Sequence, residues 1–275
     1  MKSPVLSILF LLISVTLLAV PNDFRFRHFS VEDGLSSNSV RAIMQDKYGF
    51  LWIGTEEGLN RYDGIMIKSY SICPQAAGKY ISSLYGTKKN IWIGTDEGIY
   101  IYAYATETFT YFDLTTPNNV RITSIVNHIL QDKDGNLWFS TNGQGLFRYN
   151  LSKNYLEQYE FTSAFGIVAS TMADSDNQIW ALTNQGESGV YKLNKAENKF
   201  EPFGLLYNAG NHHSQALAML EDSEQTLWLG TWECGLQKID KYTRQTTTYL
   251  HPTDGKGVTH IHSLMEYAPH QLLIG

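Results

Sequence analysis

Five copies of a short tryptophan-containing segment constrain the fold of this chain more than any other feature. Each copy reads apolar residue, Trp, two variable residues, Thr, and the tryptophans are Trp52, Trp92, Trp138, Trp180 and Trp228. The intervals between them are 40, 46, 42 and 48 residues. A recurring period of this length is typical of architectures in which every repeat forms one supersecondary unit.

Each repeat has the pattern of four short antiparallel strands. In the third copy an apolar strand at 125–132 leads into a polar turn at 132–136, the Trp strand at 137–141 and a third strand at 145–149. The turns are rich in Asp, Asn and Gly, which tolerate the left-handed backbone of tight hairpins. No segment shows a sustained helical period. The sequence therefore predicts an all-β protein, a β-propeller of four-stranded antiparallel blades.

The predicted ring is incomplete. Five blades are followed by the start of a sixth at 272–275, and residues 24–29 resemble an outer fourth strand that would complete a last blade. A seven-bladed ring with repeats of this length would need about 308 residues. We therefore predict that residues 21–275 form a partial propeller and that the chain is a piece of a longer protein.

The first twenty residues predict export. Met1 and Lys2 precede an apolar stretch at 4–20, which has the layout of a secretory signal. The stretch is long for the core of a signal and short for a spanning helix, so residues 1–20 are predicted to be either a signal peptide or an N-terminal anchor. Either one would carry the rest of the chain out of the cytoplasm.

The charge and cysteine content exclude some functions and leave others open. The net charge is −6 and no run of Lys or Arg occurs, so nothing would neutralise a phosphate backbone, and nucleic-acid binding is not expected. Cys73 and Cys234 are the two cysteines, without a CxxC motif. They could pair, stay free or be buried core residues, and they say little about the redox compartment.

The segments at 34–40, 46–55 and 58–64 resemble the first blade of two-component regulator propeller domains. These domains form the periplasmic sensor half of hybrid two-component systems in gut Bacteroidetes. In that family two seven-bladed propellers precede a sandwich domain, a membrane helix, a histidine kinase and a response regulator, and the ligands are typically oligosaccharides. The resemblance implies a periplasmic sensor that is anchored in the inner membrane and dimeric in its full-length form. The second propeller and the kinase modules are absent from this chain, so no enzymatic activity is expected of it.

A candidate ligand site follows from the topology of propellers. The turns between second and third strands and the links between blades share one face, where side chains of several blades converge. Sugar recognition needs planar apolar surfaces and groups that hydrogen-bond hydroxyls. The candidate residues on this face are Trp232, Glu233, Asn142, Gln144, Arg121, Asn211, His212 and His213. Each of them alone could equally be an ordinary solvated loop residue.

The repeat tryptophans are expected to have a structural role. A large ring that recurs in every repeat fits packing between blades better than a single binding site. Three cationic side chains on third strands, Arg61, Arg148 and Lys238, are expected to brace neighbouring blades.

No cofactor, metal ion or catalytic residue is assigned. The acidic segment at 132–136 lacks the Gly and Glu positions of an EF-hand loop and predicts a hairpin turn. His260 and His262 lie two residues apart and would permit a metal ligand pair, although solvated or core histidines are favoured. No nucleophile elbow, P-loop or Rossmann fingerprint occurs.

Two other functions remain open. A secreted glycosidase or lyase would need paired carboxylates, and Glu56, Glu57, Asp96, Glu97 and Glu233 lie on the predicted loop face. A protein-interaction scaffold would instead present a flat apolar patch.

Overall fold

The computed structural model describes residues 26–73, 79–161, 166–183, 189–205, 215–250 and 260–275. These residues form strands and one short 3-10 helix, η1 (Val31–Asp33). The strands of the five four-stranded sheets are β1 (Val40–Gln45), β2 (Leu51–Thr55), β3 (Gly58–Tyr62), β4 (Ile67–Tyr70); β5 (Ile81–Gly86), β6 (Asn90–Thr95), β7 (Gly98–Ala103), β8 (Thr108–Tyr111); β9 (Val126–Gln131), β10 (Leu137–Thr141), β11 (Leu146–Asn150), β12 (Tyr155–Tyr159); β13 (Val168–Ala173), β14 (Ile179–Thr183), β15 (Gly189–Asn194), β16 (Lys199–Leu205); and β17 (Ala216–Glu221), β18 (Leu227–Thr231), β19 (Leu236–Ile239), β20 (Thr246–Tyr249). A two-stranded sheet follows, with β21 (Leu264–Ala268) and β22 (Gln271–Ile274).

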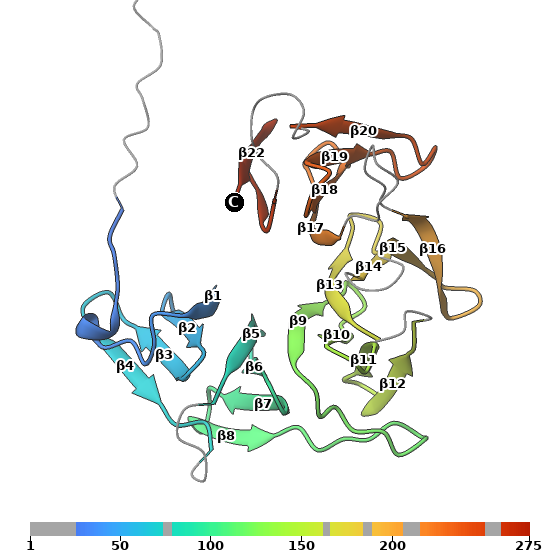
Figure 1. Ribbon diagram of the computed structural model, residues 1–275. Helices are drawn as coiled ribbons and strands as arrows, with labels where there is room; N and C mark the ends of the chain where they lie inside the picture. The colour runs from blue at the N-terminus through green and yellow to red at the C-terminus, as the bar shows by residue number, and fades with distance from the viewer. Residues whose placement is uncertain (1–25, 74–78, 162–165, 184–188, 206–214, 251–259) are drawn as a thin grey trace, which may run out of the picture.

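The sheets are arranged as the blades of a propeller, which confirms the predicted fold. Each four-stranded sheet is antiparallel and has its strands in chain order. Figure 1 shows the first strand of every sheet, β1, β5, β9, β13, β17 and β21, on the inner side of one arc, with the fourth strands outermost. The successive first strands contact one another. We call the sheets blades 1 to 5 and the β21–β22 sheet the sixth hairpin.

The two ends of the described chain differ in how well they were predicted. The Trp-like segment at 272–275 is confirmed as a strand, because β22 pairs with β21. The predicted outer strand at 24–29 is not formed by residues 26–29, the part that is described. Instead the Phe29 ring packs on Tyr62 with centroids 4.8 Å apart, and Arg27 Nη1 donates to the Tyr62 hydroxyl at 2.8 Å. These side-chain contacts fix the segment against blade 1 and not along a sheet edge.

The predicted signal or anchor at 1–20 lies outside the described residues. Within the described ranges no helix is long and apolar enough to span a membrane.

An Asp–Trp hydrogen bond closes the first hairpin of most blades. The Trp Nε1 donates to the Asp six residues earlier in four blades, at 2.8 Å for Trp52 and Asp46 and at 3.0 Å for Trp180 and Asp174. Trp138 and Trp228 repeat this arrangement. The other Asp oxygen accepts backbone N–H groups of the turn, as in Phe50 N to Asp46 at 3.0 Å. The turn predicted at 132–136 is therefore confirmed, and its Asp also anchors the tryptophan.

Blade 2 lacks this bond. Its first hairpin has Thr87 in place of the Asp, five residues before Trp92. The buried Nε1 of Trp92 has no hydrogen-bond partner. The Trp92 ring remains in its apolar cluster although Nε1 is unsatisfied. Packing therefore accounts for most of its contribution to stability.

This difference between blades predicts unequal costs for the same substitution. Trp52→Phe removes the indole N–H that donates to Asp46 Oδ2. Trp92→Phe removes an indole N–H that makes no hydrogen bond. Both lose similar apolar volume, so we expect Trp52→Phe to lower the free energy of unfolding by about 1–2 kcal/mol more than Trp92→Phe does. Urea denaturation of the two variants measures the difference. Equal losses would show that the bond to Asp46 contributes nothing.

The repeat tryptophans lie between blades, as predicted, with one exception. Trp52, Trp92, Trp138 and Trp180 are buried in four apolar clusters formed by adjacent blades. Trp228 is half-buried. The sixth hairpin that follows it has two strands, so it covers less of the face of blade 5 than a four-stranded blade covers elsewhere.

Glycine in the Trp strand permits the close approach of the next blade. A Cβ on Gly94 would lie 2.9 Å from both the Cβ and the carbonyl oxygen of Val126 on β9. A Cβ on Gly54 would meet Ile81, and one on Gly230 would meet Ile261. The recurrent Trp-x-Gly-Thr pattern thus encodes contact between blades as well as strand formation.

Candidate functional site

The second-to-third turns and the blade links lie on one face, as the topology predicted. In blades 1, 3 and 5 the residue after the second strand is hydrogen-bonded to the residue that precedes the first strand of the same blade. Examples are Asn142 N to Ile125 O and Trp232 N to Gln215 O, both at 2.9 Å. We call this side the loop face and the opposite side, which carries the Asp-containing hairpins, the Asp-turn face.

Trp232 is the centre of an aromatic group on the loop face. Its side chain is 40% exposed, which is unusual among the tryptophans of this chain. The ring meets His260 edge-on with centroids 4.0 Å apart and His262 with centroids 5.8 Å apart. The two imidazole rings are nearly parallel, at 12° and 6.5 Å. We call Trp232, His260 and His262 the Trp232 cluster.

The Trp232 cluster combines a turn of blade 5 with the beginning of the sixth hairpin. Ile261 N donates to Thr231 O at 3.0 Å, and the Ile261 side chain is fully buried. The buried isoleucine therefore fixes the two flanking histidines, which are exposed. Glu233 is exposed beside Trp232. The sequence treated the histidine pair and Trp232 as separate features, because only folding brings the two segments together.

The other candidate residues are distributed over the same face. Gln144 Oε1 accepts the backbone N–H of Thr123 at 2.8 Å and of Ser124 at 3.0 Å, and its Nε2 donates to Arg121 O at 2.9 Å. The Gln144 amide is therefore largely engaged in holding the link that leads into blade 3. The Arg121 guanidinium pairs with Asp113 at 2.8 Å.

Asn142 is exposed on the turn of blade 3, and its backbone forms a bridge with Ile167. Asn211, His212 and His213 lie outside the described residues. The structure thus joins Gln144 to Arg121, and it brings Trp232 to His260 and His262. Asn142 lies on the same turn as Gln144.

Two acidic residues of the loop face are engaged in ion pairs. Arg41 Nε donates to Glu56 Oε1 at 3.0 Å, and this hydrogen bond lowers the pKa of Glu56. Glu97 pairs with Lys79. A general acid of a glycosidase needs a raised pKa, so a lowered pKa at Glu56 does not favour that chemistry.

No metal centre is found within the described ranges. No group of three or more His, Cys, Asp or Glu side chains there could hold an ion. Cys73 and Cys234 do not form a disulfide, and Cys234 is buried.

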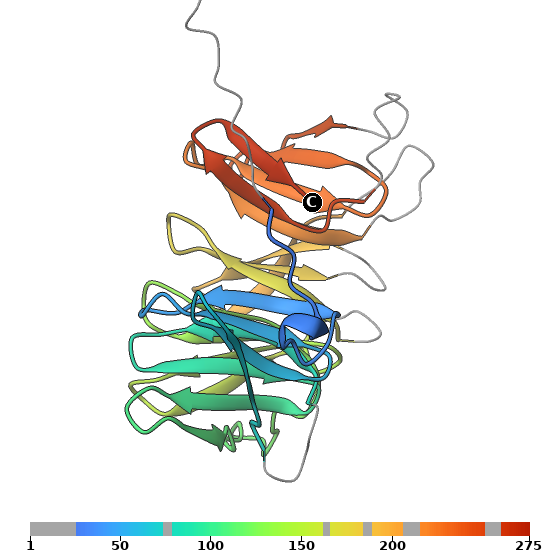
Figure 2. The ribbon, with the colours of Figure 1, turned by 90° about the vertical axis from the view of Figure 1, so that its left-hand side faces the viewer.

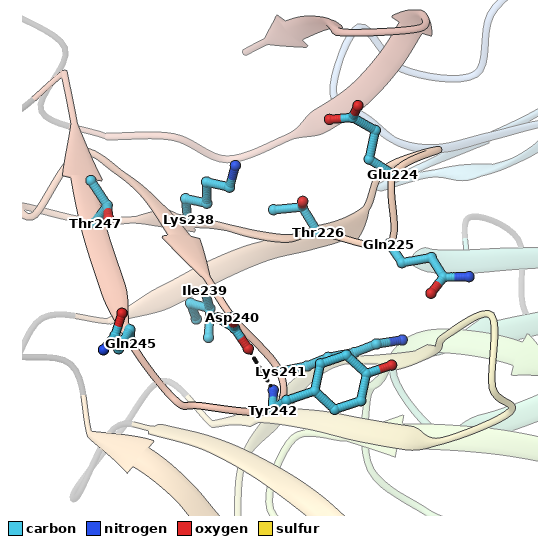
Figure 3. A pocket seen from close by; sticks show the side chains of 10 residues that line it. All are labelled: Glu224, Gln225, Thr226, Lys238, Ile239, Asp240, Lys241, Tyr242, Gln245 and Thr247. Carbon is cyan, nitrogen blue, oxygen red and sulfur yellow. Dashed lines mark hydrogen bonds between the residues drawn. The ribbon is translucent and has the colours of Figure 1, made fainter.

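The cavities found among the described residues lie on the Asp-turn side. The largest of them, about 370 Å³, lies on blade 5. Figure 3 shows its lining by the first hairpin turn, the end of β19 and the turn that follows. Cavities of about 340, 220 and 150 Å³ are lined by corresponding parts of other blades. None of these four is lined by a residue of the Trp232 cluster.

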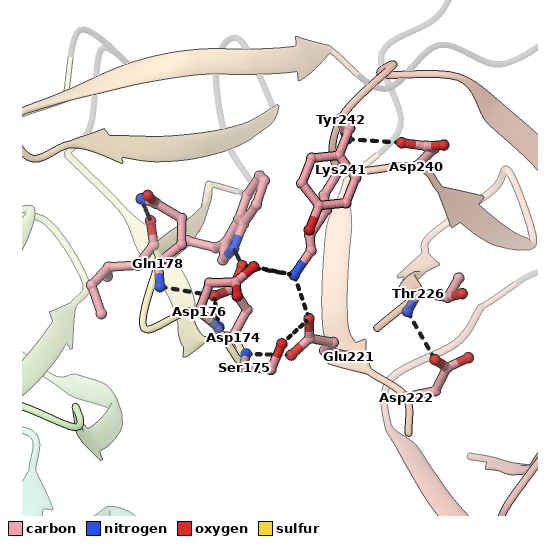
Figure 4. A network of polar contacts seen from close by, with 12 residues as sticks. Asp174, Ser175, Asp176, Gln178, Glu221, Asp222, Thr226, Asp240, Lys241 and Tyr242 are labelled. Carbon is pink, nitrogen blue, oxygen red and sulfur yellow. Dashed lines mark hydrogen bonds and ion pairs between the residues drawn. The ribbon is translucent and has the colours of Figure 1, made fainter. Parts of the chain in front are cut away.

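An ion network centred on the buried Lys241 joins blades 4 and 5 on the Asp-turn face (Figure 4). Lys241 Nζ contacts Glu221 at 2.8 Å, Asp176 at 2.9 Å and Asp174 at 3.7 Å. Burial by itself would lower the pKa of Lys241, but the hydrogen bonds to Asp176 and Glu221 outweigh it, and the pKa is raised. Lys241 therefore neutralises part of the negative charge of these carboxylates and links blade 5 to blade 4. Nothing in the local sequence of Lys241 singled it out.

The cationic side chains of third strands stack on their own blade, contrary to the prediction that they brace the next one. The Arg148 guanidinium lies 5.6 Å from the Trp138 ring and pairs with Glu157. Lys238 lies 5.8 Å from the Trp228 ring. Arg148 is the cross-strand partner of Trp138, and Lys238 is that of Trp228, so each cation stacks on a ring of its own sheet.

Comparisons with known proteins agree with this architecture. A family model described as two component regulator propeller matches residues 34–57 and 120–143. A curated histidine kinase, "Histidine kinase P4" of Formosa agariphila, is 46% identical over 68 residues, which are 25% of this chain and 5% of that protein.

Solved structures share the fold over most of the chain. The extracellular domains of two putative hybrid two component systems from B. thetaiotaomicron are 24% and 22% identical, with TM-scores of 0.73 and 0.74. The matches cover 90% and 92% of this chain but 34% and 32% of those domains. Virginiamycin B lyase from Staphylococcus aureus is 16% identical with a TM-score of 0.66, over 86% of this chain and 77% of the lyase.

The chain thus spans about a third of the length of the extracellular domains that it resembles, and a small part of the curated kinase. Its period, its blades and the two matched repeats agree with one another. The chain is therefore a β-propeller, and two of its repeats match the two component regulator propeller family model.

Proposed function

We propose that this chain is the ligand-sensing propeller of a hybrid two-component sensor, located in the periplasm. It recognises an oligosaccharide on its loop face and has no catalytic role of its own. The kinase, a second propeller and an inner-membrane anchor belong to other parts of the full-length protein, which acts as a homodimer. The repeats of the two-component regulator type and the likeness to extracellular sensor domains support this proposal.

The exposed aromatic surface of the Trp232 cluster is the single structural observation that carries the ligand class. Pyranose rings offer apolar C–H faces that pack on aromatic rings, and their hydroxyl groups need donors and acceptors beside them. Trp232 supplies the face, and Glu233, His260 and His262 supply polar groups within the same few residues. Asn142 and Arg121 are further candidates on the loop face, at blade 3 and the link before it.

Binding produces a signal only if the ligand prefers one arrangement of the receptor. A ligand with equal affinity for two states shifts no equilibrium. The Trp232 cluster joins a turn of blade 5 to the start of the sixth hairpin, so a ligand bound there would favour the arrangement in which these two units are docked.

Trp232→Ala is expected to weaken glycan binding at least tenfold, which corresponds to about 1.4 kcal/mol. The substitution removes the planar surface and leaves the fold intact, because the ring is partly exposed. Calorimetric screening of glycan fragments identifies a ligand, and titration of the variant measures the loss.

Tyr242→Ala is the matched control for this experiment. Tyr242 is also an exposed aromatic residue, at 75%, but it lies on the Asp-turn face. Its removal should leave glycan affinity unchanged. The absence of any binder across a broad panel would contradict the ligand class, and unaltered binding by Trp232→Ala would place the site elsewhere.

A further inference from the structure

The outer strands of blades 3 and 4 differ in how their charges are paired. In blade 3, Arg148 on β11 lies opposite Glu157 on β12 and forms an ion pair with it at 2.5 Å. Asn198, in the β15–β16 turn of blade 4, donates to the other oxygen of Glu157 at 2.6 Å. The cation of blade 3 is therefore neutralised within the protein.

The corresponding residues of blade 4 do not pair. Lys192 on β15 is the cross-strand partner of Trp180 and of Glu201, as Arg148 is of a tryptophan and a glutamate. Glu201 Oε1 instead accepts Asn194 Nδ2 at 2.8 Å, and Lys192 Nζ lies 5.3 Å from the centroid of the Trp180 ring. Among the ion pairs of the described residues none includes Lys192.

Arg244, in the β19–β20 turn of blade 5, takes the place of Asn198. Both residues have a positive φ, 62° for Arg244 and 52° for Asn198. Asparagine is enriched in this left-handed region, and arginine is uncommon there. The Arg244 guanidinium lies 5.1 Å from the ring centroid of Phe203 on blade 4, and no carboxylate of the described ranges forms an ion pair with it.

The two unpaired cations lie on a pair of touching rings. Phe203 and Trp180 meet edge-on with centroids 4.8 Å apart. Arg244 lies over the first ring and Lys192 over the second. Lys241, in the same turn as Arg244, is held by the ion network that Figure 4 shows. The turn is therefore fixed against blade 4 before any ligand arrives.

A cavity of about 340 Å³ lies beside these rings, between the outer strands of blade 4 and the turn of blade 5. Its described lining includes Lys192, Lys195, Glu201, Phe203 and Arg244. Lys195 and Arg244 are exposed and Lys192 is half-buried, so a ligand can reach all three cations from solvent. Three cations and one carboxylate leave the lining with an excess of positive charge. The volume is within the range of small-molecule sites, about 300–1,000 Å³.

We propose that this cavity binds the phosphate group of a small phosphomonoester. Such a group carries about −1.5 to −2 charges near pH 7 and presents three acceptor oxygens, which matches cations on two walls of the cavity. The guanidinium of Arg244 suits two phosphate oxygens at once, and Lys192 acts as a point charge. A sulfate monoester or a carboxylate carries a single charge and matches the lining less well.

The remainder of the ligand packs on the apolar part of the lining, Pro202 and Phe203. The site lies on the Asp-turn side and is independent of the oligosaccharide site on the loop face.

Phosphorus NMR titration of the full chain with phenyl phosphate and with inorganic phosphate tests the proposal, and displacement by phenyl sulfate measures the effect of charge. We expect phenyl phosphate to bind with a dissociation constant of about 1 mM, the range reached by ligands of this size. Phenyl sulfate should bind at least threefold more weakly because it has one charge. Inorganic phosphate should also bind at least threefold more weakly, because it leaves the apolar wall uncovered.

Arg244→Gln should weaken the binding of phenyl phosphate at least tenfold, and its side chain is exposed, so the fold should not change. Lys238→Gln is the matched control. Lys238 is the cross-strand partner of Trp228, as Lys192 is of Trp180, but it lines a different cavity. Its removal should leave binding unchanged.

Glu201→Gln is a second variant with the opposite expected effect. It removes the negative charge of the lining, and the new amide oxygen can still accept the Asn194 side chain. Binding of phenyl phosphate should tighten about threefold, even if Arg244→Gln disturbs its turn.

Five results would each overturn the proposal. They are failure of phenyl phosphate to bind, equal binding of phenyl sulfate or inorganic phosphate, unaltered binding by Arg244→Gln, an equal loss in Lys238→Gln, and no tightening in Glu201→Gln.

Discussion

Trp138→Ala is expected to lower the free energy of unfolding by about 3–5 kcal/mol, the range for truncating a buried tryptophan. The side chain is 1% exposed and packs on Tyr159 of its own blade and on Phe200 of blade 4, with centroids 5.6 and 6.1 Å away. The substitution creates a cavity between two blades and also removes the Nε1 donor to Asp132, which is 7% exposed. Urea denaturation followed by tyrosine and tryptophan fluorescence measures the change.

Trp232→Ala is the control for Trp138→Ala. Both variants lose the same side chain, but the Trp232 ring is 40% exposed and contacts two exposed histidines. Its removal should change the free energy of unfolding by less than about 1 kcal/mol. Similar losses in the two variants would contradict the assignment of Trp138 to the core and of Trp232 to the surface.

Gly94→Ala is expected to cost about 3 kcal/mol although it adds a single methyl group. The new Cβ would lie 2.9 Å from the backbone carbonyl oxygen of Val126, and it would also meet Ser83 Oγ. A serine hydroxyl can rotate away, but Val126 belongs to the first strand of the next blade and cannot retreat without separating the blades. Thermal and urea unfolding of the variant measure the loss.

Ser140→Ala is the matched variant in blade 3. Ser140 occupies the position of Gly94 within its Trp strand, so this blade already accommodates a Cβ there. The substitution removes only the hydroxyl contact with Thr171 and should cost about 1 kcal/mol. If Gly94→Ala were no more destabilising than Ser140→Ala, the close approach of blades would not be the reason for glycine in the Trp strand.

The fold could be predicted because its signals are local and repeated. Alternation of apolar and polar residues defines each strand, and Asp, Asn and Gly mark the turns between strands. Repetition of the Trp-x-x-Thr segment then marks the five four-stranded blades. The role of the Asp was missed because it lies six residues before the tryptophan, and only the hairpin geometry places its carboxylate at the Trp Nε1.

The candidate site could be predicted only in outline. The topology of a propeller is enough to predict which loops share a face, and Trp232 was found because it departs from the repeat. The meeting of Trp232 with His260 and His262 depends on how the sixth hairpin docks on blade 5. Two segments almost thirty residues apart carry no local signal of that contact.

The sequence by itself determined the strands, the four-stranded blades and the family resemblance, because these follow from short-range patterns that repeat along the chain. Tertiary structure alone decided which charges are paired. Gly58-Leu-Asn-Arg-Tyr62 and Gly145-Leu-Phe-Arg-Tyr149 look equivalent, but Arg148 lies opposite Glu157 and Arg61 lies opposite Lys68. The register of the neighbouring strand sets this difference, and register depends on the whole hairpin and on the blade that packs against it.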